Sequence, residues 1–137
     1  MNRNDELSGT LVLVHPDLTY DPENRKNQIG IISSAEIEND NVMVSFGKDG
    51  QGLFSTDALY VLKKGHEISA NAVRDALEMD TKDFRDILQV GLWSDSQLTK
   101  EKRQAIELAK ANPKVLEYSM ATLEDELGLK QEYSVSR

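Results

Sequence analysis

The pattern of apolar and polar positions changes near Gly65 and divides the chain into a strand-rich part and a helix-rich part. Before Gly65, apolar residues form short runs or alternate with polar ones, as they do in strands that bury one face or both. After Gly65, apolar residues recur at the spacing of one helix face. The pattern therefore predicts an α+β fold, in which a small five-stranded antiparallel barrel precedes a four-helix segment.

The strand-rich part predicts five short strands joined by turns. Residues 11–14 are apolar throughout, which is typical of a strand buried on both faces. Residues 16–27 are rich in Pro, Asp and Asn and indicate a long polar loop. Further strands are expected at 29–32, 42–46, 53–56 and 60–62, with one helical turn at 56–59. The side chains expected in the core are Val12, Val14, Ile29, Ile31, Val42, Val44 and Phe46. Five strands at this close spacing favour a closed barrel.

The helix-rich part contains four helix-start signals. Ser69, Asp80 and Ser94 are placed to act as N-caps, and Asn112 before Pro113 marks the fourth start. We expect the last helix to end at Gly128 and to bury one stripe made of Leu116, Ser119, Met120, Leu123 and Leu127.

The expected domains follow from these elements. The barrel should occupy residues 1–65, the helical segment residues 66–128, and a flexible tail residues 129–137. Because Lys63-Lys64-Gly65 is too short to act as a free linker, the helices are expected to pack on or beside the barrel.

Net charge narrows the choice of partner. The sequence holds 16 Lys and Arg residues against 24 Asp and Glu residues, a formal net charge of −8. Residues 1–65 and residues 66–137 each carry −4 of that total. Neither part offers the basic surface that non-specific binding to nucleic acid requires, and an acidic surface favours a basic partner. The alternative is that the acidic excess only keeps the protein in solution.

Several classes of chemistry lack the residues that they need. Cysteine is absent, which excludes disulfides, thiolate metal sites and a thiol nucleophile. No serine lies in a nucleophile-elbow context, and the glycines at 47–52 lack the Lys-Ser/Thr pair of a phosphate-binding loop. Asp17, Asp21 and Glu23 beside His15 lack the spacing of a calcium loop, which favours a solvated acidic loop. We expect no metal, no cofactor and no enzymatic activity.

Two further expectations concern location and nucleic acid. No apolar run approaches the ~20 residues of a membrane helix, and residues 1–10 lack a signal-peptide core, so we expect a cytoplasmic protein without membrane contact. The helix pair expected at 69–90 resembles a helix-turn-helix, which gives the alternative function of a nucleic-acid-associated regulator. Asp83 and Asp86 on the polar face of its second helix oppose phosphate, so a packing helix pair is favoured.

Three segments within residues 9–62 resemble the Src-homology-3-type small β-barrel in its KOW-like form. They are Gly9-x-x-Val12-x-Val14, Ile29-Gly30-Ile31-Ile32 and Val42-x-Val44-x-Phe46. In KOW-type modules a glycine in the second strand stands where Gly30 does, because the bent strand needs a residue without Cβ. The resemblance implies a module that binds peptides, other proteins or RNA rather than an enzyme.

The resemblance also indicates where a partner would bind. In barrels of this type, exposed aromatic residues between the first long loop and the last turn form the peptide groove. Tyr20 in the 16–27 loop and Tyr60 after the turn around Asp57 occupy comparable places, and nearby carboxylates would favour a basic segment. The candidate partner-binding residues are Tyr20, Asp21, Asp57 and Tyr60. The predicted function is a non-catalytic protein-interaction or regulatory module.

Overall fold

The computed structural model describes residues 6–19, 21 and 24–128 of the 137-residue chain. The chain forms two compact units: unit 1 comprises residues 1–61 and 122–137, and unit 2 comprises residues 62–121. The first border therefore lies before the expected one at residue 65, and residues 122–128 group with the strands rather than with the helices. The tail expected at 129–137 lies outside the described residues.

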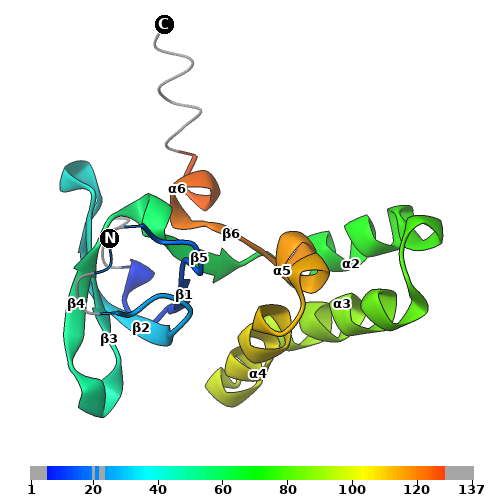
Figure 1. Ribbon diagram of the computed structural model, residues 1–137, viewed down its shortest axis with the longest axis horizontal. Helices are drawn as coiled ribbons and strands as arrows, with labels where there is room; N and C mark the ends of the chain where they lie inside the picture. Colours follow the sequence, from blue (N-terminus) through cyan, green and yellow to red (C-terminus); the bar gives the residue numbers. More distant parts are fainter. Residues whose placement is uncertain (1–5, 20, 22–23, 129–137) are drawn as a thin grey trace, which may run out of the picture. The chain divides into compact units, whose positions relative to one another are not determined.

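Six strands of the described chain form one sheet in the order β4-β3-β2-β1-β5-β6 (Figure 1). Their bounds are β1 Leu11–Val14, β2 Ile29–Glu36, β3 Asn41–Ser45, β4 Gln51–Phe54, β5 Leu59–Leu62 and β6 Met120–Thr122. The pairings β1–β2, β1–β5, β2–β3 and β3–β4 are antiparallel. The later strands are joined by 3₁₀ turns, namely η1 Ile37–Asn39, η2 Gly47–Asp49 and η3 Thr56–Ala58. The α+β class is confirmed.

The sheet is open, so the prediction of a closed five-stranded barrel is wrong. Closure would require another strand of the barrel to pair with the outer edge of β5. That edge is taken by β6, whose residues were expected inside the last helix. The helical spacing of the apolar residues near the end of the chain concealed this sixth strand.

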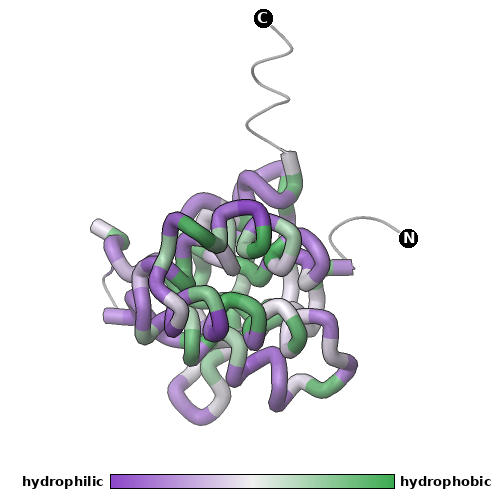
Figure 2. Tube along the Cα trace, turned by 90° about the vertical axis from the view of Figure 1, so that its right-hand side faces the viewer, coloured by the Kyte–Doolittle hydropathy of each residue, from purple (hydrophilic) through white to green (hydrophobic). Residues whose placement is uncertain are grey.

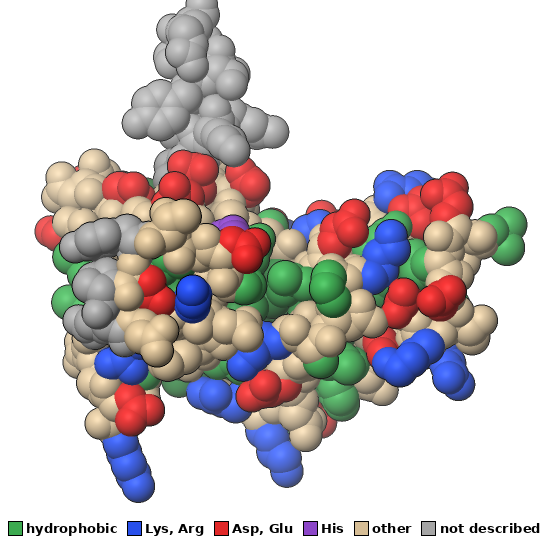
Figure 3. Space-filling view, in the orientation of Figure 1, with side chains coloured by type: hydrophobic (Ala, Val, Ile, Leu, Met, Phe, Trp, Pro, Cys, Tyr) green, Lys and Arg blue, Asp and Glu red, His purple; other side chains and the backbone are tan. Residues whose placement is uncertain are grey.

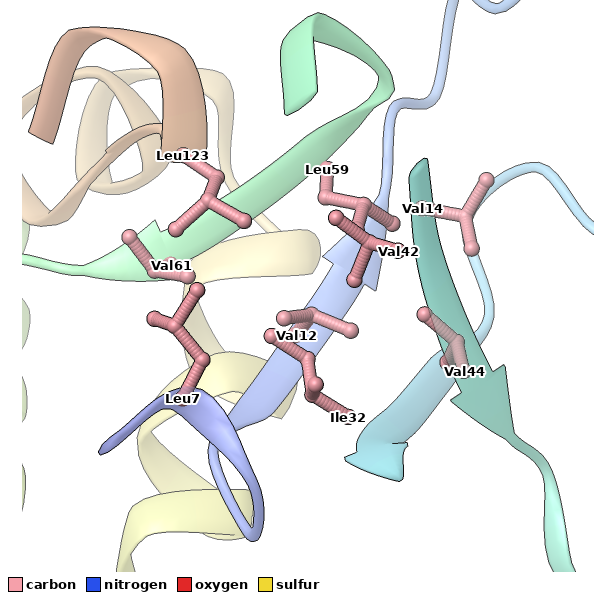
Figure 4. Close-up of a cluster of buried hydrophobic side chains, with 9 residues drawn as sticks. All are labelled: Leu7, Val12, Val14, Ile32, Val42, Val44, Leu59, Val61 and Leu123. Carbon is pink, nitrogen blue, oxygen red and sulfur yellow. The ribbon is translucent and has the colours of Figure 1, made fainter. Parts of the chain in front are cut away.

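The core of unit 1 is built from four strands and from both ends of the described chain. β1 is buried at every position, as its uninterrupted apolar pattern predicts. The buried phase of β2 differs from the expected one, because Ile32 is buried while Ile29 and Ile31 are only half-buried. Phe46 is also half-buried. The nine core side chains converge in Figure 4: Leu7, Val12, Val14, Ile32, Val42, Val44, Leu59, Val61 and Leu123.

Gly30 allows β2 and β3 to approach closely at this core. A Cβ at Gly30 would lie 2.5 Å from Cγ1 of Val44 and 2.9 Å from the carbonyl oxygen of Ser45. The pairing register of the two strands then shifts between Ile32 and Ser34, as at a β-bulge. The requirement for a residue without Cβ at this position, which the resemblance implies, therefore has a direct steric cause.

Unit 2 contains four α-helices: α2 Gly65–Arg74, α3 Thr81–Ser94, α4 Thr99–Lys110 and α5 Pro113–Ser119, with a 3₁₀ turn η4 at Ala76–Glu78. Hydrophilic positions lie mainly on the outside of these helices and hydrophobic positions inside (Figure 2). Two predicted starts are confirmed, since Asp80 precedes α3 and the Asn112 side chain accepts the backbone N–H of Lys114 at 2.9 Å. Among the described helices, none is both long enough and apolar enough to cross a membrane.

The other two predicted helix starts are wrong for a common reason. α2 begins at Gly65 rather than after Ser69, and the backbone N–H of Gly65 donates to the Asp95 carboxylate at 2.9 Å. α3 continues through Ser94, whose hydroxyl donates to the carbonyl oxygen of Lys63 at 2.6 Å. In both cases a partner distant in sequence holds the residue, so the local capping pattern did not decide the boundary.

The single stripe expected from Leu116 to Leu127 is also wrong, because the segment folds into three elements. α5 ends at Ser119, β6 is extended, and a short helix, α6 Leu123–Glu126, follows. The Thr122 hydroxyl starts α6 by accepting the backbone N–H of Asp125 at 3.1 Å. Leu123 is buried in the core of unit 1, whereas Leu116 and Leu127 are half-buried.

Candidate functional site

An imidazole and a phenol ring stack where β1 ends and β5 begins. β1 and β5 are paired with Leu13 opposite Tyr60. His15 comes two residues after Leu13, on the same face of the sheet, and its ring lies against the tyrosine ring. The two ring centroids lie 4.7 Å apart with 25° between the planes, and Nε2 of His15 is 3.3 Å from the Tyr60 hydroxyl oxygen. Both side chains are half-buried, so one side of the pair stays open to solvent.

Backbone hydrogen bonds hold His15 in this position. Its backbone N–H donates to the carbonyl oxygen of Ala58 at 2.8 Å. Its Nδ1 lies 3.0 Å from the backbone N–H of Asp17 and therefore accepts that hydrogen bond. A neutral His15 then carries its proton on Nε2 and donates it to Tyr60, so the phenol hydrogen of Tyr60 is available to an external acceptor.

The charge of Asp17 acts on the Tyr60 ring, and Asp57 lies in η3, the turn before the strand that carries Tyr60. Burial raises the pKa of Tyr60, and the negative charge of Asp17 raises it further, which keeps the phenol protonated at neutral pH. Asp57 is exposed in η3 next to Ala58, and its carboxylate accepts the Ser55 hydroxyl at 2.5 Å. We call the surface formed by His15, Asp17, Asp57 and Tyr60 the His15–Tyr60 face.

Asp21, another candidate residue, stabilises its own loop. Its carboxylate accepts the backbone N–H of Arg25 at 2.7 Å and that of Lys26 at 2.9 Å. These hydrogen bonds, the Arg25 bond foremost, lower the pKa of Asp21. The carboxylate therefore closes the 16–27 loop, and the structure does not bring it into hydrogen-bond contact with Tyr60. Tyr20 lies outside the described residues.

A second aromatic cluster lies where the 16–27 loop meets η2. The guanidinium of Arg25 stands 4.5 Å from the ring centroid of Phe46, and it also donates to the carbonyl oxygen of Asp49. Phe46 and Phe54 meet edge to face, with ring centroids 6.0 Å apart. Both rings pack against the core of unit 1, so this cluster has an evident structural role.

The net negative charge belongs entirely to unit 1. Unit 1 carries 14 acidic and 6 basic side chains, which gives −8, whereas unit 2 carries 10 of each. The described residues of unit 1 alone hold 11 acidic and 3 basic side chains, again −8. In the face drawn in Figure 3, acidic side chains gather along the upper edge of unit 1, whereas both signs alternate over unit 2. The equal division expected from the sequence arose because the halves counted were not the folded units.

The described residues hold no group of three or more His, Asp or Glu side chains placed to bind a metal ion. From the sequence, His15 was considered as part of a cation site, and its place beside Tyr60 was not predicted. The available signal was its position directly after a strand predicted to be buried, since a hairpin or barrel would bring another strand's end beside it.

Comparisons with known proteins add no assignment. No family model, no curated protein and no solved structure gives a significant match to this chain. The resemblance to Src-homology-3-type barrels therefore stays a prediction.

Proposed function

We propose that the protein is a non-catalytic interaction module whose His15–Tyr60 face binds a basic segment of another protein. The observation that carries the proposal is the charge asymmetry, because unit 1 bears −8 while unit 2 is neutral. If the negative charge served only to keep the protein in solution, it would be expected on both units. A unit with this excess attracts basic segments over several ångströms and repels nucleic acid.

The chemistry of the face suits a lysine or arginine side chain. An ammonium or guanidinium group over the Tyr60 ring would gain a cation–π interaction, and Asp17 and Asp57 lie on the two chain segments that border that ring. The half-buried rings supply apolar contact area, whereas the exposed carboxylate of Asp57 mainly accelerates encounter. Affinity should therefore depend most on Tyr60, and salt dependence most on the carboxylates.

One observation favours a second function, a nucleic-acid-associated regulator that uses α2 and α3. The two carboxylates that opposed this function in the sequence have partners within unit 2. Asp83 accepts the Asn112 side-chain N–H at 2.7 Å, and Asp86 pairs with Lys82 at 2.8 Å, while Arg85 remains exposed on the same helix. Unit 2 still lacks a net positive charge, so the basic protein segment is the better-supported partner.

A pair of variants with equal net charge tests the proposal. Asp17→Asn with Asp57→Asn removes two charges at the His15–Tyr60 face, and each asparagine keeps a side-chain oxygen acceptor. Glu78→Gln with Glu117→Gln removes two exposed charges from unit 2. Proteins captured from an extract of the producing cells are identified by mass spectrometry over a series of salt concentrations.

We expect the wild-type protein to capture a protein with a basic segment, and we expect less of it to be recovered as the salt concentration rises. Recovery should fall for the Asp17/Asp57 variant and for Tyr60→Ala, and it should be unchanged for the Glu78/Glu117 variant. Equal recovery with both double variants would contradict the proposal. Nuclease-sensitive capture, lost on Arg85→Ala, would favour the second function instead.

A further inference from the structure

One backbone edge of unit 1 is unpaired among the described strands. β4 ends the strand order, so only its inner edge pairs, and that pairing is with β3. The hairpin between them is closed by the backbone N–H of Phe46, which donates to the carbonyl oxygen of Gly50 at 2.8 Å. This bond sets the phase of the β3–β4 ladder, because hydrogen-bonded and non-hydrogen-bonded pairs alternate in an antiparallel pair.

This alternation determines which residues of β4 direct their backbone N–H and C=O groups toward β3 and which direct them outward. Counted from Phe46 and Gly50, the next hydrogen-bonded pairs are Val44 with Gly52 and Val42 with Phe54. Gln51 and Leu53 lie in the intervening pairs, opposite Ser45 and Met43, so their N–H and C=O groups point away from β3. The outer edge of β4 therefore offers the polar groups of Gln51 and Leu53 to an incoming strand.

The usual protections against strand pairing are missing along β4. Its residues, Gln-Gly-Leu-Phe, include no proline, no lysine and no inward-pointing charge. Leu53 is 58% exposed and stands opposite Met43 on the outer face of the sheet, where it can contact an added strand. The short length of β4, four residues, does protect the edge in part.

The charge of unit 1 favours a basic occupant at the β4 edge. Lys48 and Asp49 precede the strand and Asp57 follows it, and all three are exposed. A second copy of this chain would bring together two units that each carry −8. An extended segment that carries lysine or arginine would instead meet the Asp57 carboxylate and the net negative charge of unit 1.

We propose that the outer edge of β4 binds an extended basic segment of a partner protein as an added strand. The added strand pairs with the N–H and C=O groups of Gln51 and Leu53 and places an apolar side chain beside Leu53. This inference rests on the proposed function, since it assigns the binding mode of the same basic partner. Asp57 lies in η3, the turn that connects β4 to the strand carrying Tyr60.

The test uses a short synthetic peptide that alternates valine and threonine and carries lysine at both ends. The matched control is the same peptide with its strand nitrogens methylated, which keeps the charges and side chains but removes the backbone donors. On the protein, Leu53→Pro removes one outward N–H, and Leu53→Thr loses the same leucine side chain but keeps that N–H. Peptide affinity is measured by titration calorimetry, and exchange of the Gln51 and Leu53 amides by NMR.

Strand addition predicts that methylation weakens binding to the wild-type protein at least about tenfold, the loss expected from one or two net hydrogen bonds. Leu53→Pro should weaken the parent peptide more than Leu53→Thr does, and the peptide should slow exchange of both amides. Equal affinity for the two peptides would overturn the β4 edge as the site while leaving the proposed function intact. Absence of binding by either peptide would also overturn it. The proposed function fails separately, by equal capture with the charge-matched variants.

Discussion

Each of the two units contains 20 charged side chains, yet unit 1 carries −8 and unit 2 carries no net charge. Unit 2 uses its charges in short-range pairs on helix surfaces, with Arg74–Asp75 and Lys82–Asp86 each at 2.8 Å. In unit 1, carboxylates such as Asp21 and Asp40 accept backbone N–H groups, which fixes loops without cancelling charge. Composition alone therefore does not show where the net charge lies, because this depends on which residues fold together into one unit.

The core of unit 1 depends on a leucine from the end of the described chain. Leu123 is 2% exposed and belongs to the core of unit 1, although the whole of unit 2, residues 62–121, lies between it and the core residue Val61 in the sequence. Leu123→Ala should lower the free energy of unfolding by about 2–5 kcal/mol, the range for truncating a buried leucine. Urea unfolding followed by circular dichroism measures the change, with Leu127→Ala, which truncates a half-buried leucine, as the milder control. Equal midpoints for Leu123→Ala and the wild type would place this side chain in solvent.

The next largest effect on stability is expected when a methyl group is added to a glycine that packs closely against another segment. Each unit contains one such glycine that we use as a test. A Cβ at Gly65 would lie 2.3 Å from the carbonyl oxygen of Gly91, and one at Gly30 would lie 2.5 Å from Val44. Gly30→Ala and Gly65→Ala should each cost about 1–3 kcal/mol. Ser34→Ala, at an exposed position of β2, is the control.

The single tryptophan, Trp93, lies in unit 2 and separates the two glycine effects. We expect Gly65→Ala to shift the unfolding midpoint reported by Trp93 fluorescence. Amide exchange in β2 and β3 reports on Gly30→Ala. A Gly65→Ala protein as stable as the Ser34→Ala control would show that the crossing of α2 and α3 has room for a methyl group.

Each unit contains a described tyrosine with a raised pKa, and the physical cause of the shift differs between the two. The Tyr118 hydroxyl donates to the Asp75 carboxylate at 2.6 Å, and this hydrogen bond raises the pKa of Tyr118 to about 12. Burial, followed by the charge of Asp17, raises the pKa of Tyr60. Ultraviolet titration should show that Asp75→Asn lowers the pKa of Tyr118, while Asp17→Asn lowers that of Tyr60 by less.

The raised pKa of Tyr118 also makes the stability of the protein depend on pH. Folded Tyr118 holds its proton more tightly than the unfolded chain, whose tyrosines titrate near pH ~10. Its contribution to stability is therefore complete below that pH and is lost as the pH rises toward about 12. A Tyr118 pKa that does not change on Asp75→Asn would contradict the hydrogen bond as its cause.

Local patterns predicted the strands well, and long-range partners explain most of the errors. The alternation of Val42 and Val44 with polar neighbours, and the Asn112-Pro113 start, each depend on nearby residues, and both were correctly predicted. The start of α2 depends on Asp95, and β6 depends on its neighbour β5, so no local pattern could reveal them. At the candidate site, the sequence pointed to Tyr60 and Asp57. The role of His15 required the pairing of β1 with β5.

The most direct test of the account is to map a basic peptide onto the protein by NMR. The wild-type protein, labelled with ¹⁵N, is titrated with a short lysine-rich peptide at low salt and again at physiological salt. We expect the shifted amides to cluster in unit 1, at His15, Asp17, Asp57 and Tyr60, and the shifts to shrink as salt is added. Shifts confined to unit 2, or spread equally over both units, would contradict the claim that unit 1 is the binding module.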